Sequence, residues 1–396
     1  MQNNSRALFI YNTMSCCTIS RCLFVSACLV AASGNARNFS VFAYLPEWRL
    51  AGANFDALSA LASDIAFFSV EPAADGSLAG ADRLPAGEAL ASARASAAAH
   101  GASLLICAGG NGRSAHFSAV VRSPRKRARF VASLVRAVQE RGFHGVDLNW
   151  EYPGYSFSGG YQPPPEVKAD YAGLARLARD LRAALPAGAR LTLAYYPDGR
   201  QEAELRASGA WKHVDLMHAM AYDAAGGAGG HSSVALAEAA LAGGAASGLP
   251  VGKLTLGVPF YGRHSATGDW TTYEDVVQRH APLAASADAV PAPAGRSAGT
   301  IHFNGPDTIA LKTRLALQAG CGGVMIWEGG QDCRLAPVTR DGRTHARTCP
   351  GAAGGNASLL VAIARTLLAA DAGGGRGRDW LRALDGGDAA PPREEL

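Results

Sequence analysis

The sequence lacks a strong charge of either sign, a long apolar run and an even spread of cysteines. Its 37 Lys and Arg and 33 Asp and Glu leave a formal charge of only +4 over 396 residues, which gives no reason to expect a nucleic acid or another polyanion as a partner. No run approaches the roughly 20 apolar residues that span a bilayer, so no membrane anchor is predicted. The 48% of hydrophobic residues is enough to bury the core of a large domain.

The N-terminal segment differs from the rest of the chain. Arg6 and Arg21 precede an apolar stretch at 22–32 that ends in small residues and is too short to cross a membrane. This pattern is typical of a signal peptide, so we predict a signal peptide at 1–36 and a secreted, extracellular protein. The last four residues, Arg393-Glu-Glu-Leu396, loosely resemble a retention signal of the endoplasmic reticulum, although a charged tail is the simpler interpretation.

Four of the eight cysteines lie within the predicted signal peptide, so disulfides do not hold the mature domain together. The other four are Cys107, Cys321, Cys333 and Cys349. Cys333 and Cys349 flank a polar loop, and a disulfide that closes this loop is worth about 3 kcal/mol in the chain-entropy model. Free thiols are the alternative, and both remain open at this point.

From Phe39 onward, short β-branched or aromatic runs alternate with alanine-rich helical segments, as in repeated βα units. Amphipathic segments such as 127–141 and 168–185 have apolar residues at every third or fourth position. The strand-like runs are 41–45, 65–70, 104–108, 145–151, 191–195, 216–222, 254–258 and 323–327. Eight such units predict an α/β fold, the (β/α)8 TIM barrel, which typically needs about 250 residues plus insertions.

The domain boundaries follow from the gaps between these runs. The longest gap lies between the seventh and eighth runs, and 263–302 are therefore predicted to form a short insertion between strands 7 and 8. The barrel is predicted to occupy 37–370 as one domain, and we expect a monomer. The segment 371–396 is rich in Gly, Pro and charge, which predicts a disordered tail.

The fourth run has three polar side chains at alternating positions, Asp147, Asn149 and Glu151. Because side chains two apart in a strand point the same way, the three share one face. If that face is the barrel interior, Glu151 lies at the carboxyl end of the strand, where barrel active sites are built. Burial raises the pKa of a carboxyl group, which suits a proton donor. A buried Glu paired with an Arg is the structural alternative.

The segment Gly145-Val-Asp-Leu-Asn-Trp-Glu151 resembles the signature strand of family 18 chitinases, Asp-Gly-x-Asp-x-Asp-x-Glu. Further segments resemble other motifs of that family, in the same order along the chain. They are Tyr44-Leu-Pro-Glu-Trp48, Cys107-Ala-Gly-Gly110, Met220-Ala-Tyr-Asp223, Pro259-Phe-Tyr-Gly-Arg263 and Gly323-Val-Met-Ile-Trp327. Cys107 stands where the family usually has Ser. The resemblance covers roughly 41–332.

The resemblance implies retaining, substrate-assisted hydrolysis next to N-acetylglucosamine, without a metal or cofactor. By resemblance, Glu151 protonates the glycosidic oxygen while the acetamido carbonyl of the sugar attacks C1. Tyr222 donates its hydroxyl to the acetamido oxygen, and Asp223 helps to hold the distorted sugar. Trp327 forms the floor beneath that sugar, because the C–H face of a pyranose packs well on an indole.

Further residues are predicted to line the cleft or bind the substrate. They are Tyr44, Phe68, Trp150, Met220, Tyr261 and Arg263. For Phe68 and Met220, core packing explains the residue type nearly as well.

Two positions depart from the family pattern, and Asp147, at the second acidic position of that pattern, keeps it. Asn149 stands in place of the central Asp, and His144 in place of the leading one. Asn149 can accept a hydrogen bond from the acetamido N–H, but it cannot offset a positive oxazolinium, and the pKa of Glu151 is expected to be lower beside an amide than beside a carboxylate. We therefore predict a slower enzyme with a more acidic optimum. His144 is interpreted as a structural hydrogen-bonding group, since no second His lies at ligand spacing.

The short insertion predicts a shallow cleft, in which Trp270 extends the sugar platform. These features favour an endo-acting chitinase that binds chitin or other glycans containing N-acetylglucosamine. One alternative is a chitin-binding lectin on the same barrel, which Asn149 favours and the retained Glu151 disfavours. Another is an endo-β-N-acetylglucosaminidase that acts on N-linked glycans or peptidoglycan, because a fold does not fix a substrate.

Overall fold

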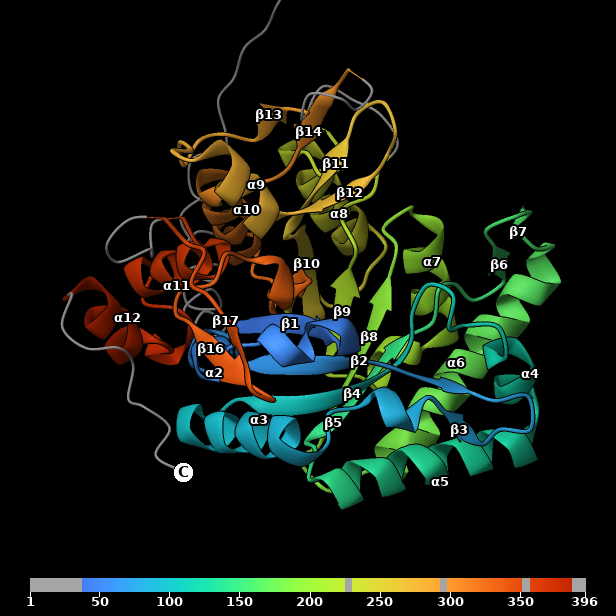
Figure 1. Ribbon diagram of the computed structural model, residues 1–396. Helices are drawn as coiled ribbons and strands as arrows, with labels where there is room; N and C mark the ends of the chain where they lie inside the picture. The colour runs from blue at the N-terminus through green and yellow to red at the C-terminus, as the bar shows by residue number, and fades with distance from the viewer. Residues whose placement is uncertain (1–37, 225–229, 293–297, 351–356, 387–396) are drawn as a thin grey trace, which may run out of the picture.

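The computed structural model describes residues 38–224, 230–292, 298–350 and 357–386. Parallel strands form a closed barrel, and helices surround it (Figure 1). The predicted signal peptide lies outside the described residues. Within the described ranges, no helix is both long and apolar enough to cross a membrane.

Eight parallel strands form the barrel. They are β1 (Ser40–Pro46), β2 (Asp64–Pro72), β4 (Ser103–Gly109), β5 (Gly145–Asn149), β8 (Arg190–Tyr195), β9 (Leu216–Ala219), β10 (Leu254–Pro259) and β15 (Gly323–Trp327). The hydrogen-bonded order is β1-β15-β10-β9-β8-β5-β4-β2, and β1 also pairs with β2, which closes the sheet. The predicted TIM barrel is confirmed, and each predicted run overlaps one of its strands.

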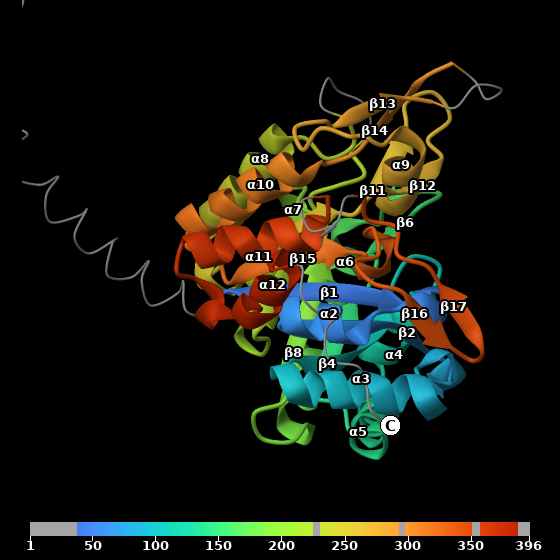
Figure 2. The same ribbon diagram turned by 60° about the vertical axis from the view of Figure 1, so that its left-hand side comes forward.

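The helices pack on the outside of the barrel. They are α2 (Phe55–Leu61), α3 (Gly87–His100), α4 (Phe117–Arg122), α5 (Pro124–Arg141), α6 (Pro164–Ala184), α7 (Arg200–Ser208), α8 (Val234–Ala246), α10 (Pro306–Gln318), α11 (Leu359–Ala369) and α12 (Arg378–Asp385). Both amphipathic segments predicted from the sequence are confirmed as α5 and α6. Figure 2 shows α11 and α12 beside α2 and β1.

Helix α5 illustrates why these segments are helical. Ser123 caps its first turn by accepting a hydrogen bond from the backbone N–H of Lys126, and Pro124 occupies the first helical position. Gly142, with a φ of 63°, ends the helix in the left-handed conformation that glycine adopts without penalty. Phe130 and Leu134, four residues apart, are buried on the same face.

The alternation of side chains along the strands gives the molecule two apolar layers. Outward-facing residues pack against the helices in a large core, to which Val146 and Leu148 of β5 belong. Inward-facing residues form a smaller cluster in the barrel interior, with Phe42, Leu105 and Met325. The candidate site is built on this second layer.

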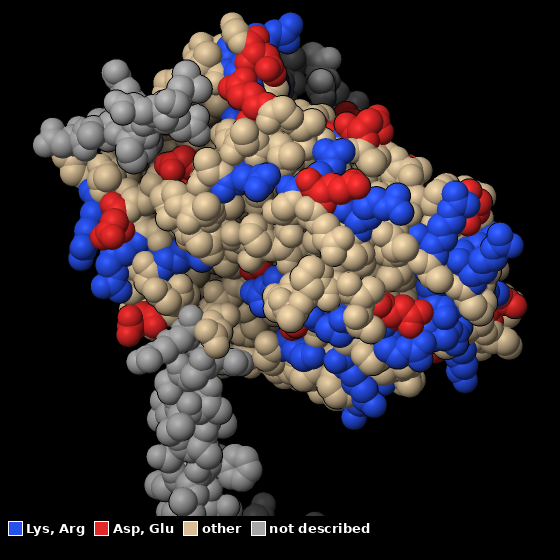
Figure 3. Space-filling model, turned by 90° about the horizontal axis from the view of Figure 1, so that it is seen from below, with Lys and Arg blue, Asp and Glu red and all other residues tan. Residues whose placement is uncertain are grey.

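Charged side chains of both signs are interspersed on the face seen in Figure 3. Lys and Arg are more frequent over α5, but acidic side chains lie among them. Arg129 pairs with Asp75 at 2.7 Å and Arg127 with Asp180 at 2.7 Å. This mixture agrees with the small net charge of the chain.

The insertion predicted at 263–302 is a small antiparallel sheet with one helix. Its strands are β11 (Tyr261–His264), β12 (Trp270–Thr272), β13 (Ala289–Pro291) and β14 (Thr300–His302), in the order β12-β11-β14-β13, and its helix is α9 (Tyr273–His280). In Figure 1 it projects from the upper side of the barrel. Two short hairpins, β6 (Tyr155–Ser156) with β7 (Gly160–Tyr161) and β16 (Val338–Arg340) with β17 (Arg343–His345), and the strand β3 (Leu78–Ala79) complete the sheets.

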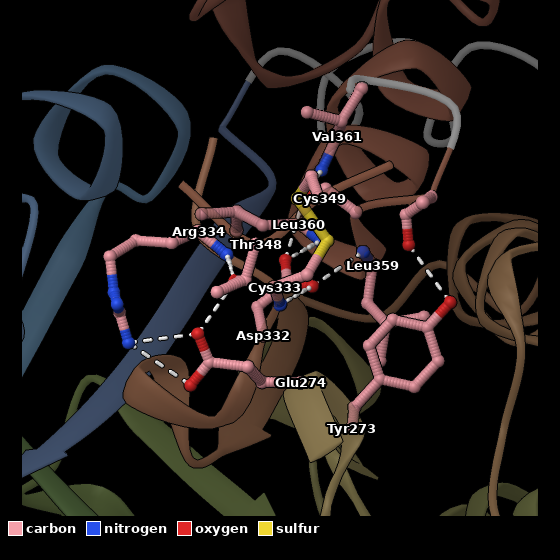
Figure 4. The surroundings of a disulfide bond; sticks show 12 residues. Tyr273, Glu274, Asp332, Cys333, Arg334, Thr348, Cys349, Leu359, Leu360 and Val361 are labelled. Carbon is pink, nitrogen blue, oxygen red and sulfur yellow. Dashed lines mark hydrogen bonds and ion pairs between the residues drawn. A yellow bond between two sulfur atoms is a disulfide. The ribbon is translucent and has the colours of Figure 1, made fainter. Parts of the chain in front are cut away.

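Cys333 and Cys349 form a disulfide, one of the two states that the sequence left open (Figure 4). The loop that it closes is also joined to the insertion, because Arg334 pairs with Glu274 of α9 at 2.8 Å and Thr348 donates to the same carboxylate at 2.6 Å. Asp332, next to the disulfide, accepts hydrogen bonds from the first turn of α11. The loop thus joins the insertion to the C-terminal helices.

The prediction of a disordered tail at 371–396 is wrong for residues 371–386. Helix α12 packs on the barrel through Leu381, and Trp380 Nε1 donates to Asp56 at 3.0 Å. Arg376 donates to backbone carbonyls that include those of His100, at 2.9 Å, and Ser59, at 3.2 Å. Composition alone suggested disorder, whereas specific polar contacts hold the segment. Residues 387–396 lie outside the described residues.

Candidate active site

A pocket opens at the carboxyl ends of the barrel strands, where β/α barrels place their active sites. Its lining residues are Phe68, Asn111, Asn149, Glu151, Tyr152, Tyr196, Met220, Tyr222, Asp223, Trp270 and Trp327. They come from the ends of several strands and, in the case of Trp270, from the insertion. Seven of the residues predicted from the sequence as catalytic or substrate-binding lie in this pocket.

Glu151 lies just beyond the end of β5. Its pKa is raised to about 7 by burial, while a hydrogen bond from the Asn149 side chain and one from the backbone of Asn111 lower it and the charge of Asp223 raises it. The backbone N–H of Glu151 donates to Ser114 Oγ at 3.1 Å. In the described part of the chain no arginine pairs with the carboxyl group, so the alternative of a structural Glu–Arg pair is wrong. A carboxyl group that holds its proton near neutral pH can serve as a general acid.

Asn149 lies two residues before Glu151 and on the same side of the strand. Its side chain is buried and hydrogen-bonded to the Glu151 carboxyl group, and its Oδ1 atom has no protein partner among the described residues. The amide therefore donates to Glu151 and keeps a free acceptor inside the pocket. Such an acceptor suits a substrate N–H group.

Asp147 lies one step deeper in the barrel and is completely buried. Its carboxylate accepts hydrogen bonds from Tyr44 at 2.8 Å and Thr192 at 2.7 Å. Burial raises its pKa to about 6, and the bonds from Thr192, Tyr44 and Cys107 lower it. His218 Nε2 lies 3.7 Å away, and burial lowers the pKa of His218 to about 3, so the imidazole is neutral. Asp147 and Tyr44 therefore support the floor of the pocket and do not line it.

Tyr222 and Asp223 follow the end of β9. The Tyr222 hydroxyl lies 3.6 Å from the Met325 sulfur, and burial raises its pKa, so it remains a hydrogen-bond donor. Asp223 adopts a positive φ of 59°, uncommon for a residue other than glycine. Its carboxylate accepts a hydrogen bond from Tyr261 at 2.7 Å and lies 3.8 Å from Arg263. These contacts fix the direction of Asp223 at the pocket.

Trp327, at the end of β15, lines the pocket and is partly exposed. Its ring contacts Tyr44, with centroids 5.4 Å apart, and Phe68, with centroids 4.8 Å apart. Phe68 and Met220 line the pocket while remaining mostly buried. For these two residues, core packing and pocket lining therefore both apply.

The two glycines after β4 allow the backbone to pass close to the floor. Gly109 and Gly110 have φ values of 107° and 105°, which other residues rarely adopt. A Cβ atom on Gly109 would collide with the carbonyl group of Asn149, and one on Gly110 with the Phe68 ring. The Gly-Gly pair is therefore a steric requirement of the site.

Tyr261 and Arg263 belong to the wall behind the pocket. Tyr261 stacks on Trp270, with centroids 4.4 Å apart and planes inclined by 5°, and the Arg263 guanidinium lies 5.1 Å from the Trp270 ring. Trp270 lines the pocket and has 49% of its surface exposed. Trp270, which the sequence analysis singled out, lies at the pocket, whereas Tyr261 and Arg263 contact Trp270 and Asp223.

The prediction that Trp150 binds substrate is wrong. Trp150 is buried and stacks on Phe117 of α4, with centroids 5.2 Å apart and planes inclined by 14°. Since Asn149 and Glu151 point toward the pocket, the residue between them points outward into the helical layer. The same alternation that identified the polar face should have excluded Trp150.

Sequence reasoning did not include three lining residues, Asn111, Tyr152 and Tyr196. Tyr196 comes directly after the last residue of β8, and Tyr152 comes three positions after the last residue of β5. A signal was available, because residues just past the carboxyl end of a barrel strand face the active site. His144, which replaces an acidic residue of the family pattern, accepts a hydrogen bond from the Leu104 N–H at 2.9 Å through Nδ1, in agreement with a structural role.

Comparisons with known proteins agree with this geometry. The family model described as glycosyl hydrolases family 18 matches residues 43–332. The chain is 27% identical to Chitinase A1 of Niallia circulans over 280 residues, which are 57% of this chain and 40% of the relative. It is 30% identical to the Class V chitinase of Arabidopsis thaliana over 182 residues, 40% of this chain and 44% of the relative.

A solved structure of catalytic domain 2 of the Ostrinia furnacalis Group II chitinase, a mutant in complex with penta-N-acetylchitooctaose, shares the fold, with a TM-score of 0.63 and 18% identity. The match covers 85% of this chain and 98% of that chain. The match to the two sequence relatives spans less than half of their length. The family model nevertheless covers most of the described barrel and includes the whole set of pocket residues, so the chain belongs to the glycosyl hydrolases of family 18.

Proposed function

We propose that this protein is an endo-acting chitinase, which cleaves β-1,4-linked N-acetylglucosamine chains with retention of configuration. The observation that carries the proposal is Glu151, a carboxyl group with a pKa of about 7 at the mouth of a barrel, between a free amide acceptor and an aromatic floor. Relatives named as chitinases, and a similar structure in complex with a chito-oligosaccharide, support chitin as the substrate class.

In the first step, Glu151 donates its proton to the glycosidic oxygen as the bond from that oxygen to C1 breaks. The acetamido carbonyl oxygen of the same sugar forms a new bond to C1, which gives an oxazolinium. Tyr222 donates a hydrogen bond to that carbonyl oxygen, and the free Oδ1 atom of Asn149 accepts one from the acetamido N–H. In the second step, water attacks C1 and the bond from C1 to the acetamido oxygen breaks, which restores the acetamido group. Glu151, now a carboxylate, takes a proton from the attacking water.

The charges around the pocket predict a modest rate. The oxazolinium is positive, and the neighbour of Glu151 along the strand is a neutral amide. Asp223 at the pocket and Asp147 beneath the floor are the acidic side chains nearest to the reacting groups in the described site. Less electrostatic stabilisation of a developing charge means a higher barrier.

The small insertion supports cleavage inside chains. Its short strands bring Trp270 to the pocket, and the exposed indole offers a surface for a further sugar ring.

We also propose that the protein is exported. The disulfide between Cys333 and Cys349 supports this location, because disulfides persist in oxidising compartments.

Asn149 also favours a second candidate function, a chitin-binding lectin in which the site binds the sugar without cleaving it. Both candidates are tested by measuring hydrolysis of a fluorogenic chitotrioside from acid to neutral pH, with the wild type and Glu151→Gln. We expect turnover by the wild type and a loss of at least about 100-fold in the variant, because the general acid is removed. If neither protein hydrolyses the substrate while both bind chitin oligomers, the proposal of an enzyme fails and the proposal of a lectin takes its place.

A further inference from the structure

A buried histidine lies behind the pocket, and the proposed reaction gives it no role. His231 precedes α8 and is 6% exposed. Its Nδ1 atom lies 3.6 Å from Oδ1 of Asp223, which lines the pocket. Its Nε2 atom lies 3.3 Å from the backbone carbonyl oxygen of Tyr261, and the centroids of the two rings are 4.8 Å apart. The imidazole therefore lies between the loop that follows β9 and strand β11.

The two neighbours of the imidazole indicate where its protons lie. A carbonyl oxygen only accepts hydrogen bonds, so the contact with Tyr261 requires a proton on Nε2. In a neutral ring, Nδ1 then carries a lone pair, which faces the negative Oδ1 atom of Asp223. Nδ1 is buried and has no hydrogen-bond partner among the described residues. Only the doubly protonated imidazolium presents an N–H group to both neighbours.

The carboxylate of Asp223 is held through one of its two oxygen atoms. Oδ1 accepts a hydrogen bond from the Tyr261 hydroxyl at 2.7 Å and lies 3.6 Å from His231 and 3.8 Å from Arg263. None of the residues that the structure describes contacts Oδ2 at hydrogen-bond or ion-pair distance. Because the contacts converge on Oδ1, the other oxygen remains available to a ligand in the pocket.

Hydrogen bonds of the neighbouring residues keep the His231 ring in this place. The Ser232 hydroxyl donates to the carbonyl group of Ala221 at 2.8 Å, and the N–H of Ala224 donates to the carbonyl group of His231 at 3.0 Å. The buried ammonium of Lys312, on α10, donates to both Oγ and the carbonyl oxygen of Ser232 at 2.8 Å. The segment that carries the histidine is thus attached to the loop after β9 and to a helix of the barrel.

The other charged or titratable groups around the ring come from three elements. They are Tyr261 and Arg263 of β11, His302 of β14, which lies against Gly230, and Lys312 of α10, which contacts Ser232. The cations Arg263 and Lys312 disfavour a second positive charge on the ring, whereas the carboxylate of Asp223 favours it. Within the described ranges, Asp223 alone lies within ion-pair distance of Nδ1, so the local geometry favours the imidazolium.

We propose that His231 is a positioning residue, which carries a second proton on Nδ1 and holds the carboxylate of Asp223 in the direction of the pocket. The inference rests on the proposed function for the identity of the ligand. A buried ion pair fixes a carboxylate more firmly than a neutral donor does. When the pH rises and Nδ1 loses its proton, the lone pair repels Oδ1 and Asp223 is held less firmly. Ligand binding therefore weakens, whether or not Glu151 titrates.

The test is the affinity for chitohexaose in the Glu151→Gln background, which removes the titration of the acid. We expect the Kd to rise about fivefold between about pH 5.5 and about pH 8, because histidine changes its charge in this range. His231→Gln cannot take up a proton and is expected to remove this dependence on pH. His302→Gln, a neighbouring histidine outside the pocket, is the matched control and keeps it.

A double-variant cycle shows whether His231 acts through Asp223. Asp223→Asn removes the negative charge, so it is expected to abolish the same pH dependence of the Kd. In that background, His231→Gln is expected to have no further effect, because residues that act as one unit are not additive. Equal and additive effects of the two substitutions would show that His231 has only an independent structural role.

A second measurement needs neither a ligand nor catalysis. The nitrogen NMR shifts of 15N-labelled histidine report the protons on each ring nitrogen, and the signals of His231 are identified by their loss in His231→Gln. We expect both nitrogens to be protonated at about pH 5.5 and Nδ1 to lose its proton as the pH rises. Asp223→Asn is expected to lower the doubly protonated fraction at about pH 6 by at least about twofold.

The two measurements separate this inference from the proposed function. If the Glu151→Gln protein does not bind chitohexaose but the nitrogen shifts respond to Asp223→Asn, the proposed function fails and the pair of His231 and Asp223 stands. The inference is overturned if Nδ1 remains unprotonated at about pH 5.5, or if chitohexaose binds with an affinity that His231→Gln leaves equally dependent on pH.

Discussion

At the scale of single residues, the acid and its neighbour set the pH range of the reaction. Glu151 must be protonated to act, and its pKa is about 7. The protonated fraction falls as the pH rises through this value, so activity is expected to decline above about pH 7. The hydrogen bond from Asn149 favours the ionised form and limits how high the pKa can rise.

Replacing Asn149 by Asp is expected to shift the falling limb of kcat/KM to higher pH by about one unit, because a second carboxylate beside Glu151 disfavours the loss of its proton. The added charge also stabilises the positive oxazolinium, and kcat is expected to rise by about tenfold. The measurement is a pH profile with a fluorogenic chito-oligosaccharide. Asn149→Ala, which removes the hydrogen bond without adding charge, is the control. An unchanged profile for Asn149→Asp would contradict this account.

At the scale of elements, the ends of the strands decide which residues reach the site. The apolar runs of the sequence predicted strands that continue through Glu151 and Tyr222. In the structure, β5 ends at Asn149 and β9 ends at Ala219. Both residues lie on the loops just beyond, which places their side chains at the mouth of the barrel. Periodicity cannot locate these ends, because a strand stops where its neighbours stop pairing. The pairing of β5 with β4 ends at Asn149, and its pairing with β8 ends at Leu148.

The disulfide belongs to the same scale, because it closes one loop. Cys333 and Cys349 are 16 positions apart, so the chain-entropy model assigns to their bond a stabilisation of about 3 kcal/mol. The double variant Cys333→Ser/Cys349→Ser is expected to lower the free energy of unfolding by this amount, measured by denaturant titration. Adding reductant to the wild type should have the same effect and should leave the double variant unchanged. Equal unfolding midpoints for the wild type and the double variant would show that the disulfide does not stabilise the protein.

At the scale of the whole molecule, helix α12 packs on the outside of the barrel. Figures 1 and 2 show α12 beside α2, and Leu381 is 3% exposed. Leu381→Ala is expected to destabilise the protein by about 2 kcal/mol, because it removes buried methyl groups and leaves a cavity. Arg382→Ala, on the exposed side of the same helix, is the control. Thermal unfolding distinguishes them, and equal midpoints for the two variants would mean that α12 contributes no packing.

The residue pattern by itself determined the barrel and its polar strand. Apolar runs repeat eight times because each strand is buried on both faces, and the alternation in β5 puts Asn149 and Glu151 on one side whatever surrounds them. The small insertion could also be predicted from the sequence, because the many residues between the seventh and eighth runs have to lie outside the barrel.

Only the tertiary structure decided which distant side chains meet. Trp270 reaches the pocket because Tyr261 and Arg263 hold its ring, and residues 371–386 are ordered because Arg376 meets carbonyl groups such as that of His100. Local periodicity carries no record of such contacts, since each depends on a complementary surface far away in the chain.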